Sequence, residues 1–351
     1  MKNEYQEVTI GNIPVGDRHP VIFMAEIGTF FNQDIDLALD YLHRIKDSGA
    51  DILKTEILHT PEICLKNTGL VCTYNHNSGK TQEDYRALVE RKVVPLKDYA
   101  RLFSSCHQLG LPIVCSVYDK DGIDFVMAQK GHGLKISRDN ISNLGLIAYA
   151  AGTDLPILFD AGDVHLHELA LAVQTARDAG QGGVIINHHP AANPAPPEAH
   201  DLHSLATYKR IFKAPVGLAC HYQGNEIMFA AVGAGVNIIE KGVDEDPDRP
   251  EQDLVSATRL AELATTVRQV KNCAAAMGQD LPEVSSPRDE SCWKCLIAWT
   301  NIQEGDTLGI HNVGFAIPPV GMPASQWPQV EGTKALRDIP QYSILNPEDF
   351  R

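Results

Sequence analysis

The chain alternates between short apolar runs and longer amphipathic segments. The apolar runs are rich in Val and Ile and have the length of β-strands, while the segments between them carry apolar residues at helical spacing. Several helical segments end in glycine, as at Gly49, Gly152 and Gly180, which is typical of a helix C-terminus. The pattern predicts helices that include residues 36–48, 121–129, 166–179 and 202–212. It predicts eight strands, at residues 21–27, 51–57, 112–117, 133–137, 156–159, 183–186, 216–220 and 236–240.

Eight strands that alternate with helices indicate a parallel sheet, and eight is the number that closes a (β/α)8 barrel in about 250 residues. An open, doubly wound sheet would favour a glycine-rich turn after the first strand. Residues 26–30 read Glu-Ile-Gly-Thr-Phe and lack that motif. We therefore predict an α/β protein with a TIM barrel over residues 21–278, preceded by an N-terminal hairpin within residues 1–20.

The sequence changes character after the predicted barrel. Residues 279–290 are polar and contain Pro and Ser, as in a linker. Residues 291–351 combine a short apolar run at 295–299, a Gly305-Asp306 turn and several prolines. We expect a small β-rich domain over residues 291–351.

Composition narrows the function classes. A formal net charge of −15 disfavours non-specific binding to nucleic acid. No apolar run approaches the roughly 20 residues of a membrane helix, and residues 1–8 lack the apolar core of a secretory signal. We expect a cytoplasmic protein without nucleic-acid or membrane partners. Of the eight cysteines, only Cys292 and Cys295 form a C-x-x-C pair, which is half of a zinc ribbon, so we expect mostly reduced, packed thiols.

Polar side chains stand at the end of every predicted strand. In barrel enzymes these ends meet at one mouth, where the active site forms. Convergence from all eight strands is therefore a catalytic arrangement, although any one of these residues alone could be a surface charge. The residues are Glu26, Lys54, Glu56, Ser116, Asp119, Lys135, Ser137, Arg138, Asp160, Asp163, His188, His189, Cys220, His221, Glu240 and Lys241.

Two chemistries follow from these residue types. Lys54, Lys135 and Arg138 could hold a phosphate or a carboxylate. The second is a divalent metal site drawn from the histidines, Cys220 and nearby carboxylates, with His221 and His188 as ligand candidates. Each could equally be a hydrogen-bonded structural histidine. Adjacent residues on a strand face opposite ways, so at most one of each adjacent pair faces the mouth.

Several short motifs, in order along the chain, resemble the sialic acid synthases. The resemblance spans about residues 8 to 348, and its C-terminal part, residues 295–306, resembles the small antifreeze-like (SAF) domain of that family. The motifs that carry it are Met24-Ala25-Glu26-Ile27-Gly28 with Asn32, Leu134-Lys135-Ile136-Ser137, Pro194-Ala195-Pro196-Pro197-Glu198, and Gly235-Val236-Asn237-Ile238-Ile239-Glu240-Lys241.

The resemblance implies a reaction. The family condenses phosphoenolpyruvate with an aldose such as N-acetylmannosamine, makes a 2-keto sugar acid and releases phosphate, with Mn²⁺ or Mg²⁺ as the cofactor. It also implies a homodimer in which the small domain of one subunit caps the barrel of its partner. By position, the resemblance matches Glu26 and Asp253 to catalytic acids, Lys54 and Lys135 to substrate-binding lysines, and His221 to a metal ligand. We add Ser116 and Arg138 as substrate-binding candidates and His188 as a second metal ligand.

The sequence also departs from the family pattern. The family's second metal-binding histidine falls at Gly242, its phosphate-site serines fall near Arg138 and Asp160, and the sugar-binding arginine of its small domain falls at Ile317. Arg138 could replace the serine hydroxyls. Two alternatives stay open: a lyase or aldolase that uses no phosphoenolpyruvate, with Lys135 as a Schiff-base nucleophile, and a non-catalytic carbohydrate-binding relative. The acceptor sugar, the metal and the role of Cys220 also stay open.

Overall fold

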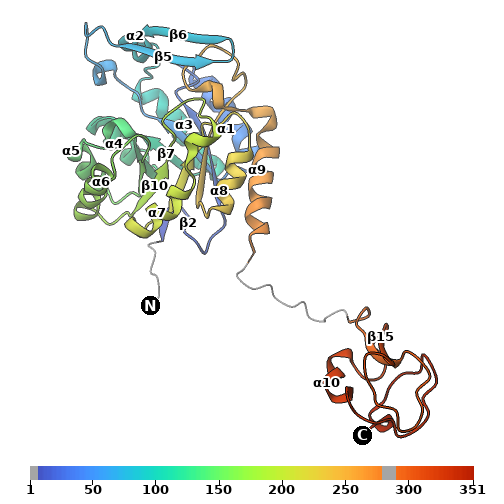
Figure 1. Ribbon diagram of the computed structural model, residues 1–351. Coiled ribbons are helices and arrows are strands. Elements are labelled where there is room, and N and C mark those ends of the chain that lie inside the picture. Colours follow the sequence, from blue (N-terminus) through green and yellow to red (C-terminus); the bar gives the residue numbers. More distant parts are fainter. Residues whose placement is uncertain (1–6, 279–289) are drawn as a thin grey trace. The chain divides into compact units, whose positions relative to one another are not determined.

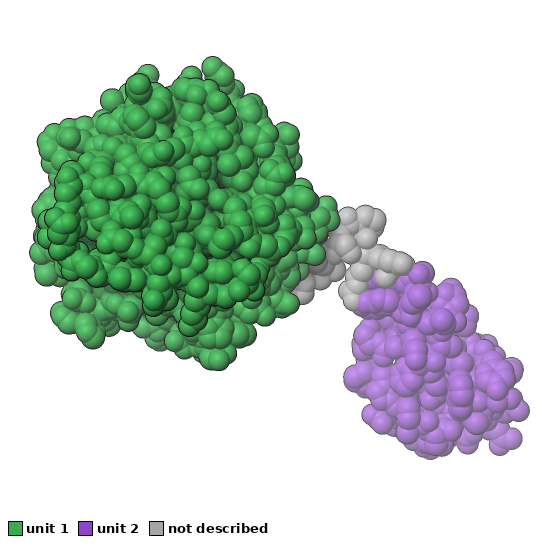
Figure 2. Space-filling model, turned by 90° about the horizontal axis from the view of Figure 1, so that it is seen from above, with its two compact units in different colours: residues 1–278 green, residues 279–351 purple. Residues whose placement is uncertain are grey.

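The computed structural model describes residues 7–278 and 290–351. The chain divides into two compact units, residues 1–278 and residues 279–351, which Figure 2 shows in green and purple. The predicted linker, residues 279–290, lies outside the described residues except for Glu290.

Eight parallel strands form a closed barrel in the first unit (Figure 1). Strand β12 pairs with both β3 and β11, which closes the sheet into a ring. The TIM barrel and the eight strands predicted from the sequence are confirmed, with bounds that differ by at most a few residues. The strands are β3 (Ile22–Gly28), β4 (Ile52–Glu56), β7 (Ile113–Ser116), β8 (Gly133–Ile136), β9 (Ile157–Asp160), β10 (Val184–His188), β11 (Val216–Ala219) and β12 (Ile238–Asp244).

A helix follows each barrel strand and covers the outside of the sheet. Local capping fixes where several of them begin; the Asp34 carboxylate, for example, accepts hydrogen bonds from the backbone N–H groups of Asp36 and Leu37. The four predicted helices are confirmed to within two residues. The helices are α1 (Ile35–Asp47), α3 (Leu96–Leu109), α4 (Lys120–Ala128), α5 (Leu144–Ala151), α6 (Leu166–Ala179), α7 (His203–Phe212), α8 (Glu226–Gly233) and α9 (Leu260–Ala276).

The two faces of each strand have different compositions. Residues that face the helices are mostly apolar and belong to the large core between sheet and helices, with buried Thr55, His188 and Lys241 as polar exceptions. Residues that face the barrel interior are apolar in the first half of each strand and polar in the second half. The apolar inward residues are Ile22, Met24, Ile52, Val114, Leu158, Ile185 and Ile238. The interior is thus a hydrophobic plug on one side and a charged chamber at the C-terminal ends of the strands.

A hairpin seals the apolar end of the barrel. Strand β1 (Val8–Ile10) pairs antiparallel with β2 (Ile13–Val15). The buried side chains of Val8, Ile10 and Val15 join the inner apolar cluster. Water therefore reaches the barrel interior from the opposite end, where the strands carry their polar residues.

An insertion between β4 and α3 crosses the open end of the barrel (Figure 1). It contains the antiparallel strands β5 (Val71–His76) and β6 (Gly79–Asp84) and the short helix α2 (Tyr85–Glu90). The Asn75 amide donates a 2.9 Å hydrogen bond to the carbonyl oxygen of Asn193, and Gln223 donates one of 2.9 Å to Asn77. These contacts hold the hairpin against the loops after β10 and β11. The sequence analysis did not predict this hairpin, because β6 carries no apolar side chain and β5 carries only a few.

The second unit is small and β-rich, with its own apolar core. Strand β14 (Cys295–Ala298) pairs antiparallel with β15 (Val313–Ala316), and isolated bridges tie in the remaining segments. A single turn of helix, α10 (Trp327–Val330), packs beside them. Cys292 is exposed and Cys295 is buried, and both are free thiols. None of the helices in residues 7–278 and 290–351 combines the length and the apolar character that crossing a membrane requires.

The N-terminal hairpin provides a test of the apolar plug. Ile10→Ala removes a fully buried side chain, and we expect the free energy of unfolding of the barrel to fall by about 2–5 kcal/mol. Thr9→Ala is the matched control, because Thr9 lies on the same strand and is exposed. Chemical denaturation of both variants measures the difference. Equal stability of the two variants would show that the hairpin does not seal the barrel.

Candidate active site

A cavity of about 570 Å³ opens at the C-terminal ends of the barrel strands. Each barrel strand, or the loop that follows it, contributes an inward-facing residue to the wall. These residues are Glu26, Lys54, Glu56, Ser116, Lys135, Asp160, His189, His221, Glu240 and Gly242. The insertion and the later loops complete the wall with Cys72, Tyr74, Asn75, Lys92, Asn193, Gln252 and Asp253, among others. This is the position of the active site in barrel enzymes.

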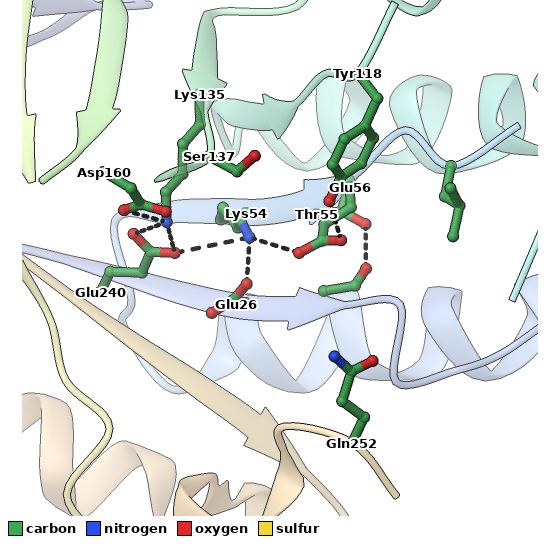
Figure 3. Close-up of polar contacts among 12 residues, drawn as sticks. Glu26, Lys54, Thr55, Glu56, Tyr118, Lys135, Ser137, Asp160, Glu240 and Gln252 are labelled. Atoms are coloured by element: carbon green, nitrogen blue, oxygen red, sulfur yellow. Dashed lines mark hydrogen bonds and ion pairs between the residues drawn. The ribbon is translucent and has the colours of Figure 1, made fainter. Parts of the chain in front are cut away.

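Lys135 lies at one end of a buried charge network in this cavity (Figure 3). Its Nζ atom is 2.7 and 2.8 Å from the two carboxylate oxygens of Glu240 and 3.0 Å from a carboxylate oxygen of Asp160. The side-chain amide of Asn187 donates hydrogen bonds to Glu240 at 2.6 Å and to Asp160 at 3.3 Å. Strands β8, β9, β10 and β12 each supply one of these four residues.

Lys54 lies at the other end of the network. Its Nζ atom contacts the carboxylate of Glu26 and is 3.2 Å from that of Glu56 and 3.7 Å from that of Glu240. Glu240 therefore links the two lysines. The Tyr118 hydroxyl donates a 2.6 Å hydrogen bond to Glu56 and also lines the cavity.

The network contains four carboxylates and two ammonium groups, so negative charge is in excess. Burial and this excess raise the pKa of Glu26 to about 7, although Lys54 acts in the opposite direction. Burial also raises the pKa of Asp160. Burial would raise the pKa of Glu240 too, but Lys135 and Lys54 lower it to about 2. At neutral pH, Glu240 is thus a fixed anion, while Glu26 exchanges a proton.

Both lysines are held in the ammonium form. Burial acts to lower the pKa of Lys135, but Asp160 and Glu240 outweigh it and raise that pKa above its ordinary value. The pKa of Lys54 rises well above its ordinary value because Glu26, Glu56 and Glu240 surround it. A protonated lysine binds anions and donates hydrogen bonds, and it is not a nucleophile.

Two histidines lie together on another part of the wall. The ring centroids of His189 and His221 are 4.4 Å apart with an interplanar angle of 79°. Burial lowers the pKa of His221 to about 4, against the opposing charge of Asp253. Burial lowers the pKa of His189 well below its ordinary value. Both rings are therefore neutral at pH 7.

His188, which the sequence analysis named as a metal-ligand candidate, does not line the cavity. His188 faces the helix layer, where its Nε2–H donates a 2.6 Å hydrogen bond to the carbonyl oxygen of His200 and its ring contacts Tyr208. The next residue, His189, takes the cavity position because successive side chains of a strand alternate between faces. The same alternation places Cys220 in the buried apolar core between sheet and helices, with His221 in the cavity.

The other sequence-derived candidates all border the cavity. Ser116 is buried at the end of β7. Arg138 follows β8, and its half-exposed guanidinium has an exposed ion-pair partner, Asp139, at 3.6 Å. Asp253, in the loop after β12, accepts a 3.1 Å hydrogen bond from the side-chain amide of Asn193. With Glu26, Lys54, Lys135 and His221, these residues surround one space.

The site residues predicted from the sequence do not include every residue that lines this cavity. Glu56, Asp160, Glu240 and His189 stood among the polar strand ends but were not chosen as site residues, and Asn187 was not singled out. The signal that finds them is the period of two along each strand, counted from a buried apolar residue. Ile185-Asn187-His189 and Ile238-Glu240-Gly242 are two such series, and each passes from the apolar plug to the cavity.

Comparison with known proteins identifies the family. The model of the NeuB family matches residues 41–281, and the chain belongs to this family. It is an enzyme of the sialic acid synthase type. The chain is 25% identical to pseudaminic acid synthase of Helicobacter pylori, over 94% of this chain and 98% of that protein. It is 24% identical to N-acetylneuraminate-9-phosphate synthase of Mus musculus, over 95% of this chain and 94% of that protein. The resemblance to sialic acid synthases is confirmed.

A solved structure supports the same fold. The N-acetylneuraminic acid synthetase of Leptospira borgpetersenii serovar Hardjo-bovis superposes with a TM-score of 0.71 at 23% sequence identity. The match covers 81% of this chain and 94% of that one.

Glu240 provides a test of the charge network. Glu240→Gln leaves Lys135 and Lys54 with fewer counter-ions, and we expect the free energy of unfolding at pH 7 to fall by about 3–5 kcal/mol. Because the folded-state pKa of Glu240 is depressed to about 2, its contribution is complete above its ordinary pKa and is lost as the pH falls towards 2. The variant and the wild-type protein should therefore converge in stability in acid.

Chemical denaturation between pH 3 and pH 7 measures this effect. Glu245→Gln is the control, because Glu245 is an exposed carboxylate that pairs with Arg44 at 3.5 Å and should contribute little. A Glu240→Gln barrel as stable as the control at pH 7 would contradict the importance of the network.

Proposed function

We propose that this enzyme condenses phosphoenolpyruvate with an aldose that resembles N-acetylmannosamine. The product is a sialic-acid-like 2-keto sugar acid, and inorganic phosphate is released. The observation that carries the proposal is the cavity, in which buried lysines and a proton-exchanging carboxylate meet at the catalytic end of a barrel of this family. The relatives, a pseudaminic acid synthase and an N-acetylneuraminate-9-phosphate synthase, support the same reaction class.

The reaction needs one proton donor and one water. C3 of phosphoenolpyruvate attacks the aldehyde carbon, and the new C–C bond moves the carbonyl electron pair to oxygen, which takes up a proton. Water then adds at C2 and loses one proton. The C2–O bond to phosphate breaks as the new C2 hydroxyl gives its proton to the departing phosphate, which leaves the 2-keto acid and inorganic phosphate. Glu26 is the acid that we assign to the aldehyde oxygen, since its pKa of about 7 leaves it partly protonated at neutral pH. Asp253, across the cavity, is the candidate base for water.

Anion binding would involve the cationic side chains. Lys54 and Lys135 are shared among carboxylates, which reduces their net attraction for a dianion. Arg138 is engaged more weakly, since its partner Asp139 is at 3.6 Å and exposed. We therefore assign Arg138 and Ser116 to the phosphate group and the two lysines to the carboxylate and the sugar hydroxyls.

A divalent cation is part of the proposal, and His221 fits one. Its Nδ1 is buried without a hydrogen-bond partner, and its ring is neutral, so a nitrogen lone pair is available. In the described residues, no three His, Cys, Asp or Glu side chains are close enough to complete a metal site by themselves. Mn²⁺ and Mg²⁺ tolerate such a site because they retain water ligands. When bound, the cation would polarise the aldehyde.

One observation favours a second candidate, a lyase or aldolase of this barrel that does not use phosphoenolpyruvate. Asp160 lies 3.0 Å from Lys135 and adds a negative charge where a phosphate would need a cation. Schiff-base chemistry at Lys135 is disfavoured, because its two carboxylate partners hold it in the ammonium form. The second candidate therefore requires a mechanism that does not start from a lysine nucleophile.

The proposal includes a cytoplasmic, domain-swapped homodimer in which the second unit is a SAF-like domain that covers the barrel of the partner subunit. The resemblance to the sialic acid synthases is its basis. We expect the full chain to sediment at twice its mass of 38.4 kDa. Analytical ultracentrifugation over a range of concentrations measures this mass. A monomer at micromolar concentration would contradict the dimer.

Phosphate release from phosphoenolpyruvate tests the reaction. With Mn²⁺ or Mg²⁺ present, we expect release to depend on an added aldose, in a panel that includes N-acetylmannosamine and its 6-phosphate. Aldose-dependent release would also identify the acceptor class. No release with any sugar, from folded and metal-loaded protein, would exclude the proposed reaction and favour the second candidate.

Lys135→Ala and His221→Ala should each abolish that turnover. The Lys135 variant loses the ammonium group that links Asp160 to Glu240, and the His221 variant loses the neutral imidazole. Lys97→Ala is the control, since Lys97 is exposed on α3 outside the cavity. Thermal unfolding of each variant separates loss of chemistry from loss of fold. Turnover retained in both cavity variants would overturn these assignments.

A further inference from the structure

We propose that His189 and His221 together bind one divalent cation, and that the site selects a transition metal such as Mn²⁺ over Mg²⁺. The inference deepens the proposed function, on which it rests for the role of a metal in the reaction. It identifies the second nitrogen ligand and the class of metal from the arrangement of this cavity.

The first observation is the pairing of the two rings. His189 follows β10 and His221 follows β11, and these strands are hydrogen-bonded neighbours in the barrel. Both side chains face the cavity, and their ring centroids are 4.4 Å apart. Two imidazoles at this separation on adjacent strands can share one ion, with water or substrate oxygens in the remaining positions.

The second observation is that both rings lack hydrogen bonds. The Nδ1 atoms of His189 and His221 are buried without partners, and the described residues give neither ring a hydrogen bond at its other nitrogen. The Asn193 side chain, which borders the same cavity, also has a buried Oδ1 without a partner. Buried polar atoms are paired in nearly all proteins, and a cluster of unpaired ones is expected where an ion or water binds.

The backbone makes room for His189. A Cβ atom on Gly162 would lie 2.5 Å from Nδ1 of His189 and 2.5 Å from its carbonyl oxygen. A side chain at position 162 would therefore displace the ring. The absence of a side chain at Gly162, in the loop after β9, thus leaves the space that the His189 ring occupies.

Charge around the pair also favours a cation. Asp253 and Glu240 act on His221 with negative charge, while Lys135 acts in the opposite direction. Lys135 and Arg138 act on His189, but Lys135 is itself neutralised by Asp160 and Glu240. The charge network of the cavity contains more carboxylates than lysines, and a bound divalent cation would offset the remaining negative charge.

The donor atoms indicate which metals bind. Imidazole nitrogen suits transition metals such as Fe²⁺ and Zn²⁺, and Mn²⁺ accepts it alongside oxygen ligands, whereas Mg²⁺ prefers a full set of oxygen ligands. Two nitrogen donors therefore favour Mn²⁺ over Mg²⁺. A site made of carboxylates and water would discriminate between the two ions only weakly.

Metal binding to the full-length, metal-free protein tests the inference without substrate. Mn²⁺ is titrated while electron paramagnetic resonance measures the free ion, and Co²⁺ absorption reports nitrogen ligation. We expect one Mn²⁺ per chain and at least a tenfold preference over Mg²⁺. His189→Asn should weaken Mn²⁺ binding by about tenfold or more, and His221→Asn should do the same.

His188→Asn is the matched control, because His188 is the adjacent histidine and faces the helix layer. It should bind Mn²⁺ as the wild-type protein does, with thermal unfolding confirming that each variant is folded. Equal Mn²⁺ affinity in His189→Asn and the wild-type protein, no Mn²⁺ binding by the wild-type protein, or equal affinity for Mg²⁺ would each overturn the inference. Metal binding as expected without phosphate release would support this site while contradicting the proposed reaction.

Discussion

The ion pair between Lys135 and Glu240 is the interaction on which the rest of the site depends. It joins β8 to β12, two strands that lie 105 residues apart in the sequence, and it passes through Glu240 to Lys54. Removing one partner of a buried ion pair typically costs about 3–5 kcal/mol, because the other charge is left without compensation. The network therefore forms only when the barrel closes, and a closed barrel holds its charged groups in fixed positions before any substrate binds.

The barrel interior has an apolar end and a polar end, and this division allows a buried charge network to exist beside the hydrophobic core. On one side, the hairpin of β1 and β2 and the first inward residue of each strand exclude water. On the other side, the cavity opens to solvent, with which its carboxylates can exchange protons. Glu26 is buried and also lines the open cavity. Its raised pKa follows from burial and from the unbalanced negative charge around it. Catalytic barrels use such shifts to keep an acid available at neutral pH.

The rim of the cavity is held by contacts between distant loops. Arg91 forms a bidentate pair with Glu251, at 2.5 and 2.9 Å, and thereby ties the insertion to the loop that carries Asp253. Asn75 and Asn193 make a second link between the insertion and the opposite wall. Because Asn193 and Asp253 lie in the loops after β10 and β12, these links position groups that the barrel strands alone would not fix.

The sequence by itself determined the barrel, because eight strands and their helices follow from local periodicity. It also predicted that Lys54, Lys135, Glu26 and His221 lie together at one end of the barrel, since polar residues at strand ends must meet once the barrel closes. Only the tertiary structure decided between His188 and His189, because the choice depends on which face of β10 is turned inward. It alone showed the insertion over the mouth, whose strands carry few apolar residues. It alone showed the Asp160–Lys135–Glu240 arrangement, because strand pairing sets those distances and local sequence does not.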